Sequence, residues 1–591
     1  MSDFTVGIDL GTTNSVVSYY RNDDENQSIS LLKIRQHIDT GLIEEKDVLP
    51  SFLYLPIESE SGNEANDALP WQKSKWVTGV FARDRGVEVP GRFVSSAKSW
   101  LCQNSTDRKQ AFLPYQSEDI TEKVSPFQAS VMYLEHIAGA WEEQHGCKLG
   151  EQTIILTVPA SFDEEAKKLT EEAARVAGFY NLTILEEPQA ALYAWVSAKG
   201  EGWRDEVEKE DVILVCDIGG GTSDFSLIKV VDQAGNLGLE RTAVGSHILL
   251  GGDNMDLALA YQAKVRMEEK KKLNSKQLRS LWFKARKVKE DVLKGKTENA
   301  QFTILGSGLK KLIGGTIKAE FTAEEVQKIL VDGFFPACSI EDQPKEEVRS
   351  GVQEMGLPYA SDAAITRHLA KFLAKQSESE DFVWPTKILF NGGVFNCDAM
   401  RERVMQVINS WSSELGRGGI EALNHSSLDN AVAKGASYYG GTRSGKGIRI
   451  RAGIARSYYI EVESAMPAIP GMPAPKKAFC IAPFGMEEGS EVEMKQKTFA
   501  LTTGKIASFQ FLSSTTRKED LCGETLEDWD EEELEESSNM EINLDSISED
   551  DASVPVHLAA RVTETGNLEL FFKHTESEKQ WLLEYSVREE N

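Results

Sequence analysis

At 591 residues, the chain is too long for a single hydrophobic core, and its length predicts roughly three or four units of domain size. The formal charge of -29 argues against nucleic acid as a partner, because binding to a phosphate backbone requires a surplus of Lys and Arg. No run approaches the roughly 18 apolar residues of a membrane span, and the N-terminal segment lacks the features of a secretory signal. Seven cysteines without a CxxC pair argue against a disulfide framework, so we expect a reducing, cytoplasmic location and no membrane partner.

Alternating apolar runs, glycine turns and amphipathic segments over the first 442 residues predict an α/β region. The apolar residues at 154–158 and 212–216 are typical of buried strands. Ser161 and Glu164 form a capping-box pattern, which predicts the start of a helix. Residues 278–292 carry apolar side chains at helical spacing and predict an amphipathic helix.

The pattern of apolar and turn residues changes from about Ile448 onward. Strand-forming residues separated by Pro and Gly turns predict a separate all-β domain at residues 448–591, joined by a short linker at residues 443–447. Residues 519–551 are acidic and poor in apolar side chains, so we expect them to form a flexible insertion in this domain.

A glycine-rich motif, which we call the glycine device, occurs twice, as GIDLGTTNS at residues 7–15 and as DIGGGTSD at residues 217–224. Each copy follows an apolar strand and provides an Asp, glycines and a hydroxyl residue. Glycine lets successive backbone N–H groups approach phosphate oxygens, and a nearby carboxylate suits Mg²⁺, which keeps waters and phosphates as further ligands. Two copies about 210 residues apart therefore predict two similar lobes that clamp one nucleotide. The GK[ST] of a Walker-type loop is absent.

These segments resemble the motifs of the 70-kDa heat-shock chaperone family, of the DnaK type. The two glycine devices are similar to the family's first and second phosphate loops. VPASFDEEAKKLTEEAARVAGF with ILEEPQAAL resembles its connecting segment, LGGDNMD its LGGEDFD, and LDNAVAKGA its closing helix. VPVHLAARVTETGNLELFF is similar to the last strands of its β-sandwich. The resemblance implies a two-lobed actin-like ATPase domain, built from duplicated ribonuclease-H-like subdomains, at residues 1–442, followed by a β-sandwich that binds a substrate or partner.

The resemblance also implies roles for individual residues. Asp9 and Asp217 would hold hydrated Mg²⁺, and Glu187 would orient or deprotonate the attacking water. The phosphate cradle would consist of Gly11, Thr12, Thr13, Asn14, Gly219, Gly220, Gly221 and Thr222. The adenosine would be bound by Gly251, Gly252, Lys289, Glu290, Gly392, Gly393 and Val394. Pro159 and Lys167 would form the family's interdomain switch.

The sequence departs from the family pattern at several points. Arg83, in GVFAR, stands where the family places a Lys near the γ-phosphate; it keeps the charge but is larger. Arg286 and Leu293 replace a Glu and a Ser in the adenosine helix, which affects selectivity for the base. The linker region reads TRSGKGIRIRAG instead of an acidic and apolar linker, so coupling by the family's route is unsupported. Nothing after Leu583 predicts the helical lid.

The resemblance implies Mg²⁺-dependent ATP hydrolysis coupled to the binding of an unfolded or extended polypeptide, or of a dedicated client, by a lidless β-domain. J-domain cochaperones and nucleotide-exchange factors are the candidate partners. Two alternatives stay open. The first is a nucleotide-gated scaffold with weak or no ATPase activity, and the second, which has no acceptor-site signature in the sequence, is a small-molecule kinase of the same fold.

Overall fold

The computed structural model describes residues 2–24, 27–57, 60, 69–72, 74–103, 107–160, 162–233, 236–245, 248–268, 272–305, 316–345, 357, 359–376, 383–423, 428–443, 454, 456–463, 476–487, 489–503, 506–514, 517, 519–527, 529, 533–543, 553–563 and 567–586. The chain divides into two compact units. Unit 1 contains residues 1–238 and 242–449, and unit 2 contains residues 239–241 and 450–591. Residues 444–447 of the expected linker lie outside the described residues.

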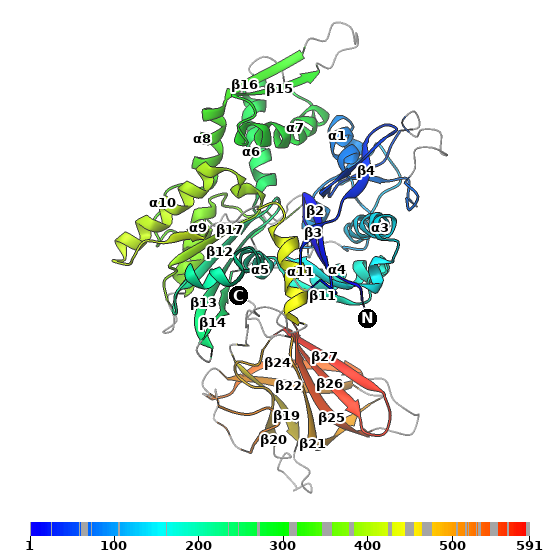
Figure 1. Ribbon diagram of the computed structural model, residues 1–591, viewed down its shortest axis with the longest axis vertical. Coiled ribbons are helices and arrows are strands. Elements are labelled where there is room, and N and C mark those ends of the chain that lie inside the picture. The colour runs from blue at the N-terminus through cyan, green and yellow to red at the C-terminus, as the bar shows by residue number, and fades with distance from the viewer. Residues whose placement is uncertain are drawn as a thin grey trace. The chain divides into compact units, whose positions relative to one another are not determined.

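Unit 1 begins with a six-stranded sheet in the order β11-β10-β1-β2-β3, in which β6 also pairs with β2 (Figure 1). Its strands are β1 (Phe4–Leu10), β2 (Asn14–Arg21), β3 (Ser30–Leu31), β6 (Val48–Pro50), β10 (Thr153–Val158) and β11 (Leu182–Glu186). β1 and β2 form an antiparallel hairpin, whereas β10 runs parallel to β1 and β11 runs parallel to β10. The central parallel strands are apolar on both faces because both faces are covered, as the fully buried run in β10 shows.

The second sheet of unit 1 has the order β14-β13-β12-β17-β18. Its strands are β12 (Val212–Ile218), β13 (Ser223–Gln233), β14 (Asn236–Val244), β17 (Lys387–Asn391) and β18 (Glu421–Leu423). β12 and β13 form an antiparallel hairpin, and β17 and β18 continue the sheet in parallel. The two sheets therefore share one connectivity, with the hairpin β1–β2 matching β12–β13 and the pair β10 and β11 matching β17 and β18.

The helices follow the same repeat. α4 (Glu164–Val176) joins β10 to β11, and α10 (Asp398–Glu414) joins β17 to β18. α5 (Glu187–Lys199) follows β11, and α11 (Ala431–Arg443) follows β18. The sequence repeat of the two glycine devices is thus part of a duplicated topology within unit 1.

Two glycines allow α11 to lie against the first sheet and against α5. A Cβ atom at Gly7 would lie 2.3 Å from the carbonyl oxygen of Ala433. A Cβ atom at Gly435 would lie 1.7 Å from the carbonyl oxygen of Ala190. Because both clashes are with backbone, side chains at these positions would force the two halves of unit 1 apart.

The remaining regular elements of unit 1 are divided between its two halves (Figure 1). In the first half they are β4 (Ile34–Asp39), β5 (Leu42–Lys46), β7 (Leu53–Tyr54), β8 (Val77–Thr78), α1 (Val80–Glu88), η1 (Pro90–Arg92), β9 (Phe93–Val94), α2 (Ala97–Trp100), α3 (Pro126–His145), η2 (Leu149–Glu151) and η3 (Gly200–Asp205). In the second half they are α6 (Gly252–Glu268), α7 (Ser275–Leu293), β15 (Asn299–Leu305), β16 (Thr316–Thr322), α8 (Ala323–Phe334), α9 (Ile365–Gln376) and η4 (Gly393–Asn396). The amphipathic helix expected at residues 278–292 is confirmed as part of α7.

The start of α4 differs from the capping box expected at Ser161. The N-cap is Asp163, whose side chain accepts a hydrogen bond from the backbone N–H of Ala166 at 2.7 Å. Asp163 also accepts two hydrogen bonds from the guanidinium of Arg108, at 3.0 and 2.6 Å. A carboxylate at the N-cap is favoured by the helix dipole as well as by the cap bond, so Asp163 takes the position. Ser161 itself lies outside the described residues.

Unit 2 contains two antiparallel sheets. One has the order β23-β20-β19-β22-β24 and the other has the order β21-β25-β26-β27. The strands are β19 (Ser457–Glu463), β20 (Lys476–Ala482), β21 (Glu491–Thr502), β22 (Ile506–Ser514), β23 (Thr525–Leu526), β24 (Glu535–Asn543), β25 (Ser553–Val562), β26 (Asn567–His574) and β27 (Gln580–Ser586). Phe479 and Phe511 from the first sheet share an apolar cluster with Val556 and Leu570 from the second. In the described part of unit 2, all regular elements are strands.

Within residues 519–551, where a flexible insertion was expected, the described ranges 519–527, 529 and 533–543 contain the strands β23 and β24. β24 pairs with β22 along its whole length, and β23 pairs with β20. The buried Leu534, together with Leu526 and Trp529, packs on the first sheet, so a few apolar side chains anchor this acidic stretch.

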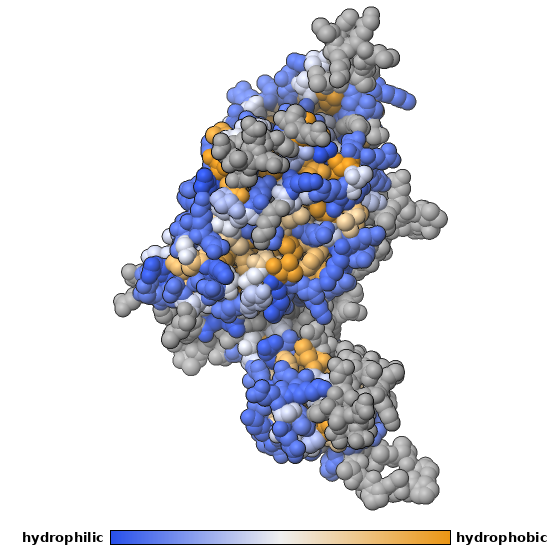
Figure 2. All heavy atoms as spheres, turned by 90° about the vertical axis from the view of Figure 1, so that its right-hand side faces the viewer, coloured by the Kyte–Doolittle hydropathy of each residue, from blue (hydrophilic) through white to orange (hydrophobic). Residues whose placement is uncertain are grey.

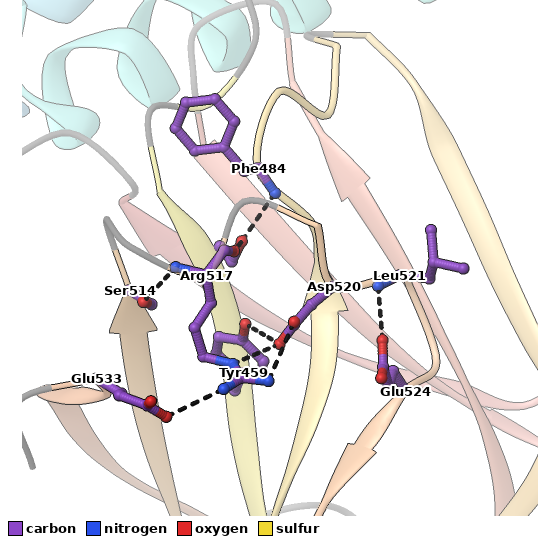
Figure 3. Close-up of polar contacts among 9 residues, drawn as sticks. Tyr459, Phe484, Ser514, Arg517, Asp520, Leu521, Glu524 and Glu533 are labelled. Atoms are coloured by element: carbon purple, nitrogen blue, oxygen red, sulfur yellow. Dashed lines mark hydrogen bonds and ion pairs between the residues drawn. The ribbon is translucent and has the colours of Figure 1, made fainter. Parts of the chain in front are cut away.

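A polar cluster holds the loop before β23 (Figure 3). The Arg517 guanidinium donates to the Asp520 carboxylate at 2.8 and 3.2 Å and to Glu533 at 3.0 Å. The hydroxyl of Tyr459, on β19, donates to Asp520 at 2.7 Å. These charge-assisted bonds neutralise part of the acidic charge and stabilise the described part of this stretch.

On the face drawn in Figure 2, hydrophilic side chains predominate, and apolar ones gather in separate patches. Within the described residues, no helix combines the length and apolar character needed to cross a bilayer.

Candidate nucleotide site

The two glycine loops of unit 1 open onto one cavity of about 390 Å³. Asp9, near the end of β1, and Asp217, near the end of β12, both line it. The other residues of the expected phosphate cradle that line it are Gly11, Thr12, Thr13, Asn14, Gly219, Gly220 and Thr222. The volume falls within the range of roughly 300–1,000 Å³ typical of small-molecule sites.

The two loops touch each other, and glycine is needed where they do. A Cβ atom at Gly220 would lie 2.2 Å from the Thr13 hydroxyl oxygen. A Cβ atom at Gly221 would lie 3.2 Å from the Thr12 hydroxyl oxygen of the first loop and 2.6 Å from the hydroxyl oxygen of Ser99, on α2. Gly221 does not line the cavity, so it contributes to the contact between the loops and not to the cavity wall.

Three carboxylates and one ammonium group meet at the end of the cavity between the loops. Glu187, the first residue of α5, lies with its Oε1 atom 2.5 Å from the Nζ atom of Lys98, on α2. Burial and the neighbouring Glu187 carboxylate raise the pKa of Asp9 to about 7, and Lys98 opposes this shift. Burial, with the carboxylates of Glu187 and Asp224, raises the pKa of Asp217 well above its ordinary value. Negative charge therefore exceeds positive charge here, and a bound cation would stabilise the ionised carboxylates.

The donor atoms fit a hydrated Mg²⁺ ion. Asp9 and Asp217 offer carboxylate oxygens, which this hard cation prefers. Within the described ranges, no group of three or more acidic, His or Cys side chains could enclose an ion by itself. An ion would thus keep water and phosphate ligands, as Mg²⁺ does at nucleotide sites. The buried Oδ1 atom of Asn391, a residue that lines the same cavity, has no hydrogen-bond partner among the described residues and is a further acceptor.

The expected adenosine residues line the same cavity, with one exception. Gly252, Lys289, Glu290, Gly392, Gly393 and Val394 all line it. Gly251 lies behind the wall, where a Cβ atom would come within 2.7 Å of the Gly219 carbonyl oxygen. The apolar residues Leu293, Val394, Met400 and Leu428 share the cavity and suit the flat face of a base.

Two basic side chains of α7 are neutralised inside the protein. Lys289 places its Nζ atom 2.6 Å from the Asp256 carboxylate and donates to the Gly252 carbonyl at 2.8 Å. Arg286 pairs with Asp253 at 2.5 Å and with Asp256 at 3.0 Å. The resemblance places a Glu where this chain has Arg286. Two acidic partners on α6 compensate the positive charge of this Arg.

Arg83 lines the cavity, but the structure does not make it the buried cation of the site. Its side chain is 42% exposed, and its Nε atom donates to the carboxylate of the neighbouring Asp84 at 2.8 Å. Lys98 is only 9% exposed and lies against Glu187. Its ammonium also lies 5.6 Å from the centre of the Phe162 ring. The role expected for Arg83 stays a prediction, and the cation that lies beside Glu187 is Lys98.

The sequence contained a signal for Lys98 that the motif comparison did not use. Lys98 lies between Ala97 and the apolar Trp100 and Leu101, and a Lys in such a run is rarely buried unless an acidic partner accompanies it. The G-x-x-x-K pattern points to Arg83 because it depends on the spacing from a glycine and takes no account of burial.

The expected interdomain switch residues lie on the segment that follows β10. The carbonyl oxygen of Pro159 accepts a hydrogen bond from the backbone N–H of Phe162 at 3.2 Å. Lys167, on α4, is buried, and neither residue lines the cavity. Phe162 packs in one cluster with Leu101, so this segment backs the short helix that carries Lys98.

Comparison with known proteins agrees with this geometry. Residues 62–331 match the family model described as Hsp70 protein. This part of the chain is therefore similar to Hsp70 proteins. The chaperone protein HscA of Photorhabdus laumondii subsp. laumondii is 33% identical over 267 residues, which cover 43% of this chain and 36% of that protein. The HscA homolog of Tolumonas auensis is 31% identical over 268 residues, covering 44% of this chain and 36% of the homolog.

The HscA homolog of a Shewanella species is 30% identical over 339 residues, covering 54% of this chain and 46% of that protein. The chain thus spans between about a third and a half of the length of these relatives. The Hsp70 match contains Lys98, Glu187 and the second glycine loop, whereas the first loop and residues 392–394 lie outside it. The cavity joins the matched and the unmatched parts of the chain in one site.

Proposed function

We propose that the protein binds ATP with Mg²⁺ in the cavity between the two glycine loops of unit 1 and hydrolyses it. One observation carries the proposal: Asp9, Asp217, Glu187 and Lys98, from four different elements, meet in a cavity whose wall contains both loops. The duplicated sheet order and the Hsp70 match support an actin-like ATPase domain with two related subdomains. A dehydrogenase-type or Walker-type site would need a different loop at this place.

The residues divide the work of phosphoryl transfer among themselves. Backbone N–H groups of the two loops would bind phosphate oxygens, with Thr12, Thr13, Asn14 and Thr222 adding side-chain contacts. Mg²⁺, when bound near Asp9 and Asp217, supplies neutralisation of the phosphate charge. Glu187 would orient the attacking water and accept its proton, while Lys98 would offer positive charge to the transferred group.

We propose that the hydrolysis cycle serves a chaperone function in which unit 2 binds an extended polypeptide or a dedicated client. The support is the relation to Hsp70 and HscA chaperones and the two-sheet architecture of unit 2. A J-domain cochaperone and a nucleotide-exchange factor are the partners that such a cycle would use, and Pro159 with Lys167 would belong to the route between units.

A nucleotide-gated scaffold is the second candidate, and one contact favours it. The Oε1 atom of Glu187 already lies 2.5 Å from Lys98, so the general base is neutralised by a buried cation. If this pair stays closed when ATP is bound, hydrolysis would be slow although binding is intact. In that case the slow turnover would itself prolong the ATP-bound state that gates the scaffold.

The test is calorimetric titration of the full-length protein with ATP and Mg²⁺, followed by measurement of phosphate release in a single turnover. We expect one nucleotide per chain with micromolar affinity. Absence of binding would reject both candidates, whereas tight binding without phosphate release over hours would select the scaffold. Release of phosphate within minutes would select the ATPase.

A further inference from the structure

The part of the cavity next to Asp217 contains an amide that the proposed mechanism has not used. Asn391 is the last residue of β17 and lies opposite Asp217 in the parallel pair β12–β17. Its Nδ2 atom donates to the Oδ2 atom of Asp217 at 2.8 Å. The ionised carboxylate that a bound cation would stabilise can only accept hydrogen bonds, so in that state the Nδ2 end of the amide is the donor.

The other end of the amide has no partner within the part of the chain that the structure describes. Asn391 is 1% exposed, and its Oδ1 atom is buried and unpaired while the residue lines the nucleotide cavity. Buried amide oxygens in proteins are normally paired, so an unpaired one on a cavity wall indicates that a ligand or its water supplies the missing donor.

Gly392, the residue after Asn391, also lies close to the carboxylate of Asp217. Gly392 has a φ angle of +87°, and a Cβ atom there would lie 2.7 Å from the Oδ1 atom of Asp217. Glycine thus lets the chain pass close to this oxygen, while Asn391 holds the other. The Asn391–Gly392 pair fixes the carboxylate plane of Asp217 from one side and leaves Oδ1 without a side chain in front of it.

We propose that Asn391 is a positioning residue for the hydrated divalent cation of the bound nucleotide: Nδ2 holds Asp217, and Oδ1 accepts a hydrogen bond from a water of the cation. This inference rests on the proposed binding of nucleotide with Mg²⁺ between the loops. It concerns the cation and not the phosphate cradle, because Asn391 donates to Asp217, a proposed ligand of the cation. Removal of Asn391 therefore weakens the contribution of Mg²⁺ to binding and leaves metal-free binding largely intact.

The test compares ADP binding to the full-length protein by calorimetry, in excess Mg²⁺ and in EDTA. For Asn391→Leu, which has a similar size but no polar atoms, we expect the gain in affinity due to Mg²⁺ to fall about tenfold. Two lost hydrogen bonds, each worth roughly two- to tenfold, give this scale. Affinity in EDTA should change less than about twofold.

Asn430→Leu is the matched control. Asn430 also has an Oδ1 atom that is buried without a partner, but it does not line the cavity. We expect this variant to keep the full effect of Mg²⁺, and a loss equal to that of Asn391→Leu would overturn the inference.

Other outcomes are equally decisive. Equal weakening in Mg²⁺ and in EDTA would show a merely structural role, and unchanged affinities would show none; either result rejects the inference while the proposed function stands. If the wild-type protein binds no ADP, the proposed function fails and the inference fails with it. Should Asn391→Leu not fold, as judged by thermal unfolding, Asn391→Ser retains one hydroxyl and should lose about threefold of the Mg²⁺ effect, and a Ser variant identical to wild type would reject the inference.

Discussion

Replacement of Lys98 by Met is the sharpest test of the site. The sequence resemblance assigns the cation of the site to Arg83, whereas the structure has Lys98 beside Glu187. Lys98 and Glu187 have side-chain exposures of only 9% and 15% and lie 2.5 Å apart. Arg83 is 42% exposed and pairs with an exposed Asp84. The two basic residues line one cavity, so Lys98→Met and Arg83→Met form a matched pair.

The expected magnitudes follow from burial. A charge preorganised in a water-poor site and aimed at the transferred group contributes roughly 10²–10³ in rate, or about 3–4 kcal/mol. An exposed ion pair contributes about 0–1 kcal/mol. We therefore expect single-turnover hydrolysis to fall at least ~10²-fold in Lys98→Met and no more than about fivefold in Arg83→Met.

Thermal unfolding controls for damage to the fold. Removal of one partner from a buried pair leaves the other charge uncompensated, at a cost of about 3–5 kcal/mol, so Lys98→Met should also unfold more easily. The double variant Lys98→Met with Glu187→Gln removes both charges and should recover part of that stability while staying inactive. A large loss of turnover in Arg83→Met, together with near-normal turnover in Lys98→Met, would refute the assignment of the buried cation to Lys98.

Three further predictions concern other parts of unit 1. Glu187→Gln should keep ATP affinity within a few fold and lower turnover at least ~10²-fold, as measured by calorimetry and phosphate release; normal turnover would remove Glu187 from the mechanism. Gly220→Val should weaken nucleotide binding more than tenfold, because even a Cβ atom there lies 2.2 Å from the Thr13 oxygen, and an affinity equal to wild type would contradict the contact between the loops. Burial lowers the pKa of His136 from 6.5 to about 4, so the folded state favours its neutral form. The contribution of His136 to the free energy of unfolding is therefore complete above pH 6.5 and is lost as the pH falls toward 4. We expect the free energy of unfolding, measured by chemical unfolding, to fall by about 2 kcal/mol between pH 7.5 and pH 5. His136→Gln should lose less over the same range, and an equal loss in the variant would reject the assignment.

The sequence predicted the α/β character of the first 442 residues and the convergence of its two glycine loops because both depend on local patterns. Apolar runs such as β10 are typical of covered parallel strands, and the glycine devices require close backbone approach wherever they occur. Of the expected cradle and adenosine residues, only Gly221 and Gly251 lie behind the cavity wall, where they support the loops.

What the sequence did not reveal depends on contacts between distant segments. Lys98 and Glu187 are 89 residues apart, and Asn391 and Asp217 are 174 residues apart, so no local spacing connects them. The acidic stretch before β24 looked unstructured by composition, yet Leu534 and the bonds among Arg517, Asp520 and Tyr459 hold it. Local periodicity cannot show such pairings, because they exist only once the sheets have formed.

The central claim is that one nucleotide with its cation lies between the two glycine loops. A crystal structure of the full-length protein with a non-hydrolysable ATP analogue and Mn²⁺, whose anomalous signal locates the metal, tests this directly. The account predicts the metal beside Asp9 and Asp217, with the phosphates against residues 11–14 and 219–222. A metal peak or nucleotide bound elsewhere, with this cavity holding only solvent, would contradict it.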